Sequence, residues 1–327
     1  MYTRNQSRFE LRQLMAMLVC AAAGFATAYA ADKETQTQFA SPDQALATLR
    51  AAAQAGDTNA LRKLFGPAWN EIANPDAIQR AHQLADFARH LGEFTDLATQ
   101  ANQTVVIHLG DKHWPFPIPL IATNGQWVFD TAAGREEILN RRIGHNELSA
   151  LEVCHAFVQA QREYATKDHA GNGVMEYAQR LHSTPGTRDG LYWETKSGEE
   201  QSPFGPLVAR AQEEGYYPPQ PQGSAEPKAY APFHGYIFKV LKKQGPDAPG
   251  GKYDYVINGH MVAGFALLAY PVEWGNSGVM TFVVNQQGKV FQKNLGKQTA
   301  NLAAHLDEYN PDAAWQAVEP VATGACK

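Results

Sequence analysis

The sequence predicts an α+β protein, in which helices and antiparallel strands occupy separate stretches of the chain. Three observations support this prediction. Capped helical patterns fill residues 41–91, strand patterns follow over residues 104–130, and a second helical pattern over residues 147–166 precedes strand patterns between residues 236 and 293. The expected architecture is a group of N-terminal helices packed on a curved antiparallel sheet, followed by one long helix packed on a second antiparallel sheet.

Length and charge set broad limits on function. The chain has 327 residues, of which 44% are hydrophobic and 19% are charged, and this is enough sequence for two compact domains. Lys and Arg total 28 against 33 Asp and Glu, so the net charge is -5. Because no basic excess is available to neutralise a phosphate backbone, we expect no nucleic-acid partner.

Residues 1–30 predict a secretory signal peptide. A basic segment precedes an apolar run rich in small residues, and Ala28-Tyr29-Ala30 offers the small-x-small pattern that signal peptidase cleaves. A retained membrane anchor is the alternative, but the apolar run of about 17 residues is at the lower limit for a membrane span. We therefore expect a periplasmic or secreted mature protein, with a polar leader at residues 31–40 and no later membrane span.

The first helices carry local start signals. Ser41 before Pro42, with Gln44 in position to complete a capping box, predicts a helix start, and Asp57 predicts a cap for a second short helix. Asn74-Pro75 opens a third helical pattern that ends before Gly92. Helices should therefore fill the first part of a domain that spans residues 41–143.

The strands of this domain are predicted at residues 104–109, 116–123 and 126–130. Asn124-Gly125 joins the last two in a type I′ turn, because both central positions of that turn need a positive φ. Helices followed by such a sheet, ending in Gly125-Gln126-Trp127-Val128-Phe129-Asp130, resemble the cone-shaped fold of nuclear-transport-factor-two-like domains over residues 40–143. The resemblance implies a cone that can hold a ligand or a catalytic site or serve for docking, so it selects no function.

The second domain is predicted to span residues 146–327. Gly144-His145-Asn146 is expected to break the helical pattern and to mark the boundary, and nine prolines between residues 203 and 249 predict irregular loop. Strand patterns occur at residues 236–241, 253–257, 264–270, 279–284 and 290–293.

A long helix, a glycine-rich loop and an antiparallel sheet in this order resemble the globular heads of type IV pilin-like proteins and pseudopilins. The similar segments are residues 160–165, Asn172-Gly173, residues 235–238 and residues 269–278. A pilin's assembling apolar helix is missing before Glu147, so the resemblance is limited to the head.

A third resemblance covers most of the mature chain. The signal peptide, the segment Ser183-Thr184-Pro185-Gly186-Thr187-Arg188-Asp189-Gly190-Leu191-Tyr192-Trp193, and residues 254–259 with 279–282 are similar to the bacterial secreted family called domain of unknown function 2950. This resemblance implies an exported protein without an assigned activity.

Two groups of residues are candidate metal ligands. Asp168, Asn172 and Glu176 offer oxygen ligands around two glycines and form a weak candidate calcium site. Their spacing is not that of an EF-hand, and we prefer a helix cap with a turn as the explanation of the same residues. Some pseudopilin heads carry calcium. His108 and His113 are weaker candidates for zinc, because no third ligand lies at regular spacing beside them. We expect no other cofactor.

A partner could contact the polar and aromatic cluster of Arg188, Asp189, Tyr192 and Trp193. Exposed, this cluster would suit an envelope protein or a glycan, and the alternative is a structural loop packed on the sheet.

Three cysteines occur, and Cys20 would leave with the signal peptide. The remaining pair, Cys154 and Cys326, is expected to form a disulfide in an oxidising compartment. Such a bond would hold the C-terminus against the long helix, as in pilin heads.

These observations predict an exported, non-enzymatic envelope protein that acts as a scaffold or binding module. The alternative is a periplasmic hydrolase that uses carboxylates in the cone, such as Asp130 or Glu136. A cone filled by Trp127 and Phe129 would favour the scaffold, whereas carboxylates converging with a histidine would favour the enzyme.

Overall fold

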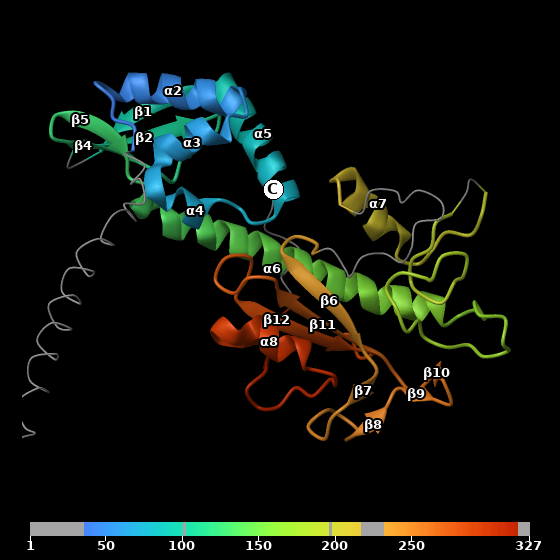
Figure 1. Ribbon diagram of the computed structural model, residues 1–327. Coiled ribbons are helices and arrows are strands. Elements are labelled where there is room, and N and C mark those ends of the chain that lie inside the picture. The colour runs from blue at the N-terminus through green and yellow to red at the C-terminus, as the bar shows by residue number, and fades with distance from the viewer. Residues whose placement is uncertain (1–35, 101–102, 196–197, 217–231, 320–327) are drawn as a thin grey trace, which may run out of the picture.

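The computed structural model describes residues 36–100, 103–195, 198–216 and 232–319, and Figure 1 shows its arrangement. The predicted signal peptide and Cys326 lie outside these ranges. The described chain combines helices with antiparallel sheets, which confirms the α+β class.

The N-terminal helices begin where the local signals place them. Ser41 Oγ accepts a hydrogen bond from the Gln44 N–H at 3.2 Å, and Asp57 Oδ1 accepts from the next helix at 2.9 and 3.0 Å. The third long helix is capped by Asp76, two residues after the predicted Asn74. The elements are α2 (Pro42–Gln54), α3 (Thr58–Phe65), η1 (Gly66–Ala68), α4 (Trp69–Ile72) and α5 (Ala77–Glu93).

The first sheet is antiparallel, in the order β1-β2-β4-β5, with β3 also paired to β2. Asn124 and Gly125 have φ values of 53° and 78°, which confirms the predicted tight turn. The sheet differs from prediction, because β1 and β3 were not expected and the strand expected at residues 116–123 begins only at Leu120. The strands are β1 (Thr95–Thr99), β2 (Thr104–Leu109), β3 (Trp114–Pro115), β4 (Leu120–Thr123) and β5 (Gln126–Phe129).

Helix α6 (Thr131–Tyr164) is one continuous helix of 34 residues, and it extends from the first sheet to the second (Figure 1). The helix break expected at Gly144-His145-Asn146 was therefore wrong. A helical glycine costs only about 1 kcal/mol relative to alanine, and tertiary contacts on both sides of this segment outweigh that cost.

The second sheet has the order β14-β13-β12-β11-β6 and is antiparallel throughout. Strand β11, which pairs with β12 on one side and β6 on the other, is buried except at Tyr270. The Pro-rich region expected to be loop contains α7 (Gly205–Glu213), which the proline near its first turn suits well. The other elements are β6 (Tyr236–Leu241), β7 (Lys243–Gln244), β8 (Tyr253–Asp254), β9 (Val256–Ile257), β10 (His260–Met261), β11 (Ala266–Pro271), β12 (Met280–Asn285), β13 (Phe291–Asn294), η3 (Gly296–Gln298), α8 (Thr299–Ala304) and β14 (Gln316–Ala317).

Each sheet has its own hydrophobic core. The first core joins α2, α3 and the inner face of the first sheet, and the second core joins the C-terminal half of α6 to the second sheet. Within the described residues, no helix is both long enough and apolar enough to span a membrane, and this includes α6.

Candidate functional site

Buried polar side chains connect the two cores at the middle of α6. Asn146 is only 1% exposed. Its Oδ1 accepts a hydrogen bond from Gln79 Nε2 of α5 at 2.9 Å, and its Nδ2 donates to the Ser277 carbonyl of the β11–β12 loop at 2.8 Å. We call Asn74, Gln79, Arg142, Asn146 and Ser277 the polar seam. It joins elements of both cores to one turn of α6.

Arg142 adds a buried cation to the polar seam. Its guanidinium donates to the Ile72 carbonyl on one side and to Asn276 Oδ1 on the other. Burial lowers the pKa of Arg142 to about 10, and the negative charge of Glu273 opposes this shift. The guanidinium therefore stays protonated at neutral pH. We call the part of the protein built around the first core the first unit, and the part built around the second core the second unit. Arg142 links the first unit to the β11–β12 loop of the second unit.

The interior of the first unit is filled by aromatic rings. Phe129 is 1% exposed, and its ring centroid lies 5.3 Å from that of Phe65 and 6.3 Å from that of Phe39. Phe116 and Phe87 extend the cluster with a stacked contact at 5.1 Å. These rings therefore pack together in the first hydrophobic core.

Asp130 and Glu136, the two carboxylates considered for a hydrolase, do not occupy the positions that a catalytic site would require. Asp130 caps α6, and its Oδ1 accepts a hydrogen bond from the Ala133 N–H at 3.0 Å. Glu136 lies exposed on α6. The structure does not bring these two side chains together with a histidine.

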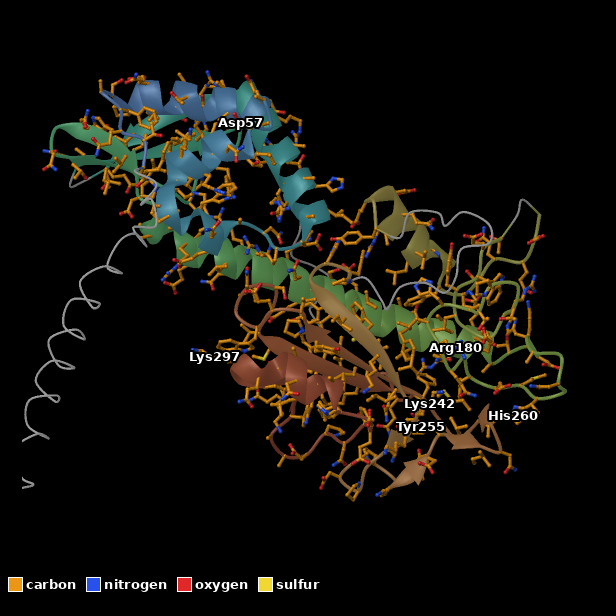
Figure 2. All side chains as sticks on the ribbon, in the orientation of Figure 1. Asp57, Arg180, Lys242, Tyr255, His260 and Lys297 are labelled. Carbon is orange, nitrogen blue, oxygen red and sulfur yellow. The ribbon has the colours of Figure 1, made fainter. Side chains whose placement is uncertain are left out.

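The predicted partner-contact residues form an ordered loop beside the C-terminal end of α6, near Arg180 in Figure 2. Trp193 is 7% exposed and is covered by the Arg188 guanidinium, which lies 5.2 Å from the ring centroid. Arg188 Nη1 in turn contacts Glu200 Oε2 at 3.1 Å. Trp193 therefore packs as part of the core, and the charged ends of Arg188 and Glu200 lie on the surface above it.

Asp189 fastens the same loop. Its carboxylate accepts hydrogen bonds from the Thr184 N–H at 2.7 Å, from Thr184 Oγ1 at 2.9 Å and from Thr187 Oγ1 at 2.8 Å. Burial opposes ionisation, but these hydrogen bonds hold the pKa of Asp189 below its ordinary value. The Tyr192 N–H completes the loop by donating to the Leu181 carbonyl at 2.9 Å. We call residues 180–194 the 180s loop.

The candidate calcium ligands are close in space, but their oxygens already have partners. Asp168 accepts from the Gly173 N–H at 2.8 Å and from the Asn172 N–H at 3.2 Å, and these bonds lower its pKa, the Gly173 bond most. Asn172 Nδ2 donates to Glu176 Oε1 at 3.2 Å, and the same oxygen lies 3.1 Å from Nδ1 of His260, which Figure 2 labels. Hydrogen bonds among these protein groups explain the arrangement without a cation.

His108 and His113 gain the third group that the sequence did not show. The carboxylate of Asp96, on the unpredicted strand β1, contacts both imidazoles. Burial opposes ionisation, but hydrogen bonds from His113 and His108 lower the pKa of Asp96. The sequence pattern predicted no strand at residues 95–99. Such a prediction would have placed Asp96 beside His108.

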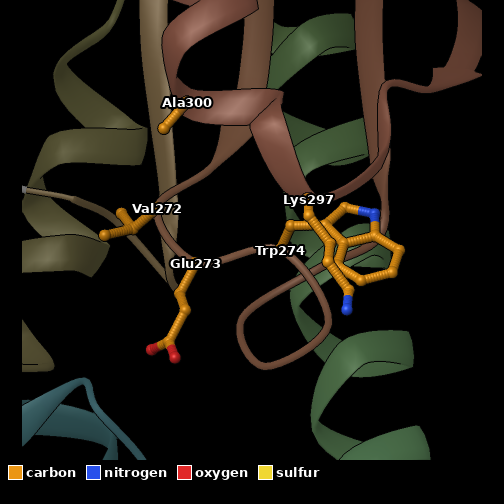
Figure 3. Close-up of a pocket in the computed structure, with 5 residues that line it drawn as sticks. All are labelled: Val272, Glu273, Trp274, Lys297 and Ala300. Atoms are coloured by element: carbon orange, nitrogen blue, oxygen red, sulfur yellow. The ribbon is translucent and has the colours of Figure 1, made fainter.

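A surface pocket of about 320 Å³ lies elsewhere, at the β11–β12 loop and α8. Trp274 and Lys297 both line the pocket, and Figure 3 shows that the Glu273 side chain points away from them. Trp274 Nε1 donates to Asn294 Oδ1 at 2.9 Å. The remaining lining residues are Val272 and Ala300.

Cys154 is fully buried in α6, and burial raises the pKa of its thiol to about 12. Its predicted partner Cys326 is outside the described residues.

Comparison with known proteins gives one match. The family described as "Protein of unknown function (DUF2950)" matches residues 36–318. No curated protein and no solved structure matches the chain.

Proposed function

The chain belongs to the family of proteins of unknown function DUF2950, and from this premise we propose that it is an exported, non-enzymatic envelope protein that acts as a scaffold or binding module. The proposal includes cleavage of the signal peptide, residence in the periplasm or outside the cell, and the likeness of the two units to nuclear-transport-factor-two-like cones and pilin heads.

The observation that carries the proposal is the connection between the two units. The C-terminal half of α6 lies in the second core, and Ile138 of the same helix packs against the first core. The polar seam joins the middle of α6 to α5 on one side and to the β11–β12 loop on the other. Buried hydrogen bonds of this kind favour one arrangement over its competitors, because breaking them leaves polar groups unsatisfied. A protein that holds two units in one arrangement suits the work of a scaffold.

The filled interior of the first unit favours this function over the hydrolase. A catalytic cone needs space for a substrate beside its carboxylates. Here phenylalanine rings fill the interior, Asp130 caps a helix and Glu136 faces solvent. We therefore keep the hydrolase only as the alternative.

The partner surface that we assign is the 180s loop. Its hydrogen bonds hold it in one conformation, so it can bind a partner without a large cost in conformational entropy. Arg188, Asp189 and Tyr192 present polar groups at half-exposed positions, above the buried Trp193. An envelope protein or a glycan with hydrogen-bonding groups suits this surface.

Site-specific photo-crosslinking in the native cell tests the proposal. A photoreactive residue in place of Glu194, the exposed last residue of the 180s loop, should give a discrete adduct with an envelope component after irradiation. The matched control is the same residue in place of Glu136, which is exposed on α6 in the first unit. Export is tested in the same sample, because the mature protein should begin at Ala31 or Asp32. A chain that retains Met1, or an absence of adducts from Glu194, would contradict the proposal.

A further inference from the structure

Two imidazoles and one carboxylate meet at the turn end of the first sheet. Asp96 of β1 lies directly opposite His108 of β2 in the antiparallel register. Residues in such a pair project from the same face of a sheet, with Cβ atoms about 5 Å apart. His113 comes from the turn that follows β2, immediately before β3.

The polar atoms of this group are close together. His108 Nδ1 lies 3.2 Å from Asp96 Oδ2, and His113 Nδ1 lies 3.0 Å from Asp96 Oδ1. One potential ligand atom from each residue can be chosen so that all three lie within 4.8 Å of one another. Ligand atoms on a tetrahedral zinc ion with bonds of 2.0–2.1 Å are about 3.3 Å apart. Small side-chain adjustments would therefore bring all three onto one ion.

The backbone positions each side chain. His108 lies between β1 and β3 in the sheet, and its neighbours Ile107 and Leu109 are buried in the core on the opposite face. His113 has a φ of 48°, a left-handed conformation that few non-glycine residues adopt, and its N–H donates to the Gly110 carbonyl at 3.0 Å. The Phe94 ring packs edge-on against the His113 imidazole at 5.2 Å.

We propose that Asp96, His108 and His113 bind a divalent transition-metal ion, and that zinc fits the site best. Imidazole nitrogen and carboxylate oxygen are both common zinc ligands, and a set of three protein ligands leaves one coordination position open. The His113 side chain is 58% exposed and that of Asp96 is 37% exposed, so the open position faces solvent. Water or a group from another molecule can occupy it.

Other histidine–carboxylate contacts in the described chain contain only one imidazole each. His90 lies 3.1 Å from Glu93, His260 lies 3.1 Å from Glu176, and His234 lies 2.6 Å from Glu214. These pairs are explained by hydrogen bonding alone. Among the described residues, the Asp96 group alone brings three potential metal ligands together.

Zinc titration of the mature chain without an affinity tag tests the proposal. Isothermal titration calorimetry with zinc chloride should show one saturable site. Asp96→Asn keeps the size of the side chain and removes its charge, and His113→Gly removes an imidazole where glycine accepts the positive φ. Each substitution should weaken binding at least about tenfold. The control is His90→Ala, which removes a nearby imidazole outside the site and should bind zinc like the wild type.

Cobalt(II) gives an independent readout. The wild type loaded with cobalt should show visible d–d absorption bands, and the two site variants should lose them while keeping wild-type circular dichroism. Absence of saturable zinc binding by the wild type would overturn the proposal, as would equal affinity in the wild type, Asp96→Asn and His113→Gly. Because the titration uses purified protein, its failure is distinct from a failure to find an envelope partner.

Discussion

Gln79 and Asn146 are 67 residues apart, yet their side-chain amides meet at 2.9 Å inside the protein. Gln79 is 6% exposed and Asn146 is 1% exposed, so water cannot replace either partner without local opening. The Nδ2 group of the same Asn146 side chain donates a hydrogen bond to the Ser277 carbonyl. A single asparagine on α6 therefore satisfies polar groups from both units.

We expect Asn146→Ala to lower the free energy of unfolding by about 3 kcal/mol, because the Gln79 amide and the Ser277 carbonyl would both remain buried without this partner. Urea unfolding followed by circular dichroism measures the change. The matched control is Asn140→Ala at an exposed position of the same helix, which should stay within about 0.5 kcal/mol of the wild type. A similar loss in both variants would show that the polar seam does not contribute specifically.

The two glycines of α6 should respond in opposite directions to substitution by alanine. A Cβ on Gly144 would meet no atom within 4 Å, so Gly144→Ala should raise the free energy of unfolding by about 0.5–1 kcal/mol through helix propensity. A Cβ on Gly134 would lie 2.7 Å from the Pro117 carbonyl oxygen, so Gly134→Ala should lower it by about 1–3 kcal/mol. Urea unfolding of both variants checks this, and stabilisation by Gly134→Ala would contradict the close packing of α6 on the first unit.

Stability should fall as the pH is lowered from 7.5 to 5.5. Burial lowers the pKa of His169 and of His182 in the folded protein. Below about pH 6.5 the histidines of the unfolded chain are protonated, whereas these two histidines of the folded chain stay neutral to lower pH. Protonation therefore stabilises the unfolded state relative to the folded state. Above that pH both states hold neutral imidazoles and these groups contribute nothing.

A substitution isolates the contribution of His169, whose ring stacks on Tyr164 at 4.4 Å. His169→Phe keeps an aromatic ring there and cannot titrate, so the difference in unfolding free energy between pH 7.5 and pH 5.5 should become smaller. Urea unfolding at both pH values measures it. An unchanged difference in this variant would show that His169 is not a source of the pH dependence.

Calcium should not change the stability of the loop at residues 168–176. Its oxygens already accept hydrogen bonds from the backbone and from Asn172. A chelator should therefore leave the melting temperature of the wild type unchanged, whereas Asp168→Ala should lower it with or without calcium. Differential scanning fluorimetry measures both, and a chelator-dependent shift in the wild type alone would restore the calcium site.

Cys154 and Cys326 should form a disulfide in protein taken from the envelope without reductant. Because a buried thiol with a pKa of about 12 reacts slowly even when it is free, alkylation must be carried out in denaturant. Mass spectrometry should then find neither cysteine alkylated, and a reduced sample should show both alkylated as the control. Two alkylated cysteines without reductant would exclude the bond.

Local signals predicted the helix starts and the tight turn well. A cap at Ser41 or Asp57 needs only the next three residues, and the turn at Asn124-Gly125 needs only two positive φ angles. These features depend on short-range chemistry, so the sequence displays them directly.

Features that depend on distant partners were missed. Strand β1 is short and half-buried, and its pairing with β2 places it in the sheet. Without β1, Asp96 could not be connected with His108, so only two members of the histidine–carboxylate group could be named. Gly144 was mistaken for a helix end because its local cost is visible in the sequence, whereas the buried contacts of Arg142 and Asn146 around it are not.

The continuity of α6 makes its residue count a measure of how the two units are oriented. Each residue of an α-helix adds about 1.5 Å of length and about 100° of rotation. A single residue inserted near Asn140 would lengthen the spacing only slightly, but it would rotate the second unit by more than a quarter turn about the helix axis. Asn146 would then face away from Gln79. Insertions and deletions within this helix should therefore be tolerated far less than those of equal length in the surface loops.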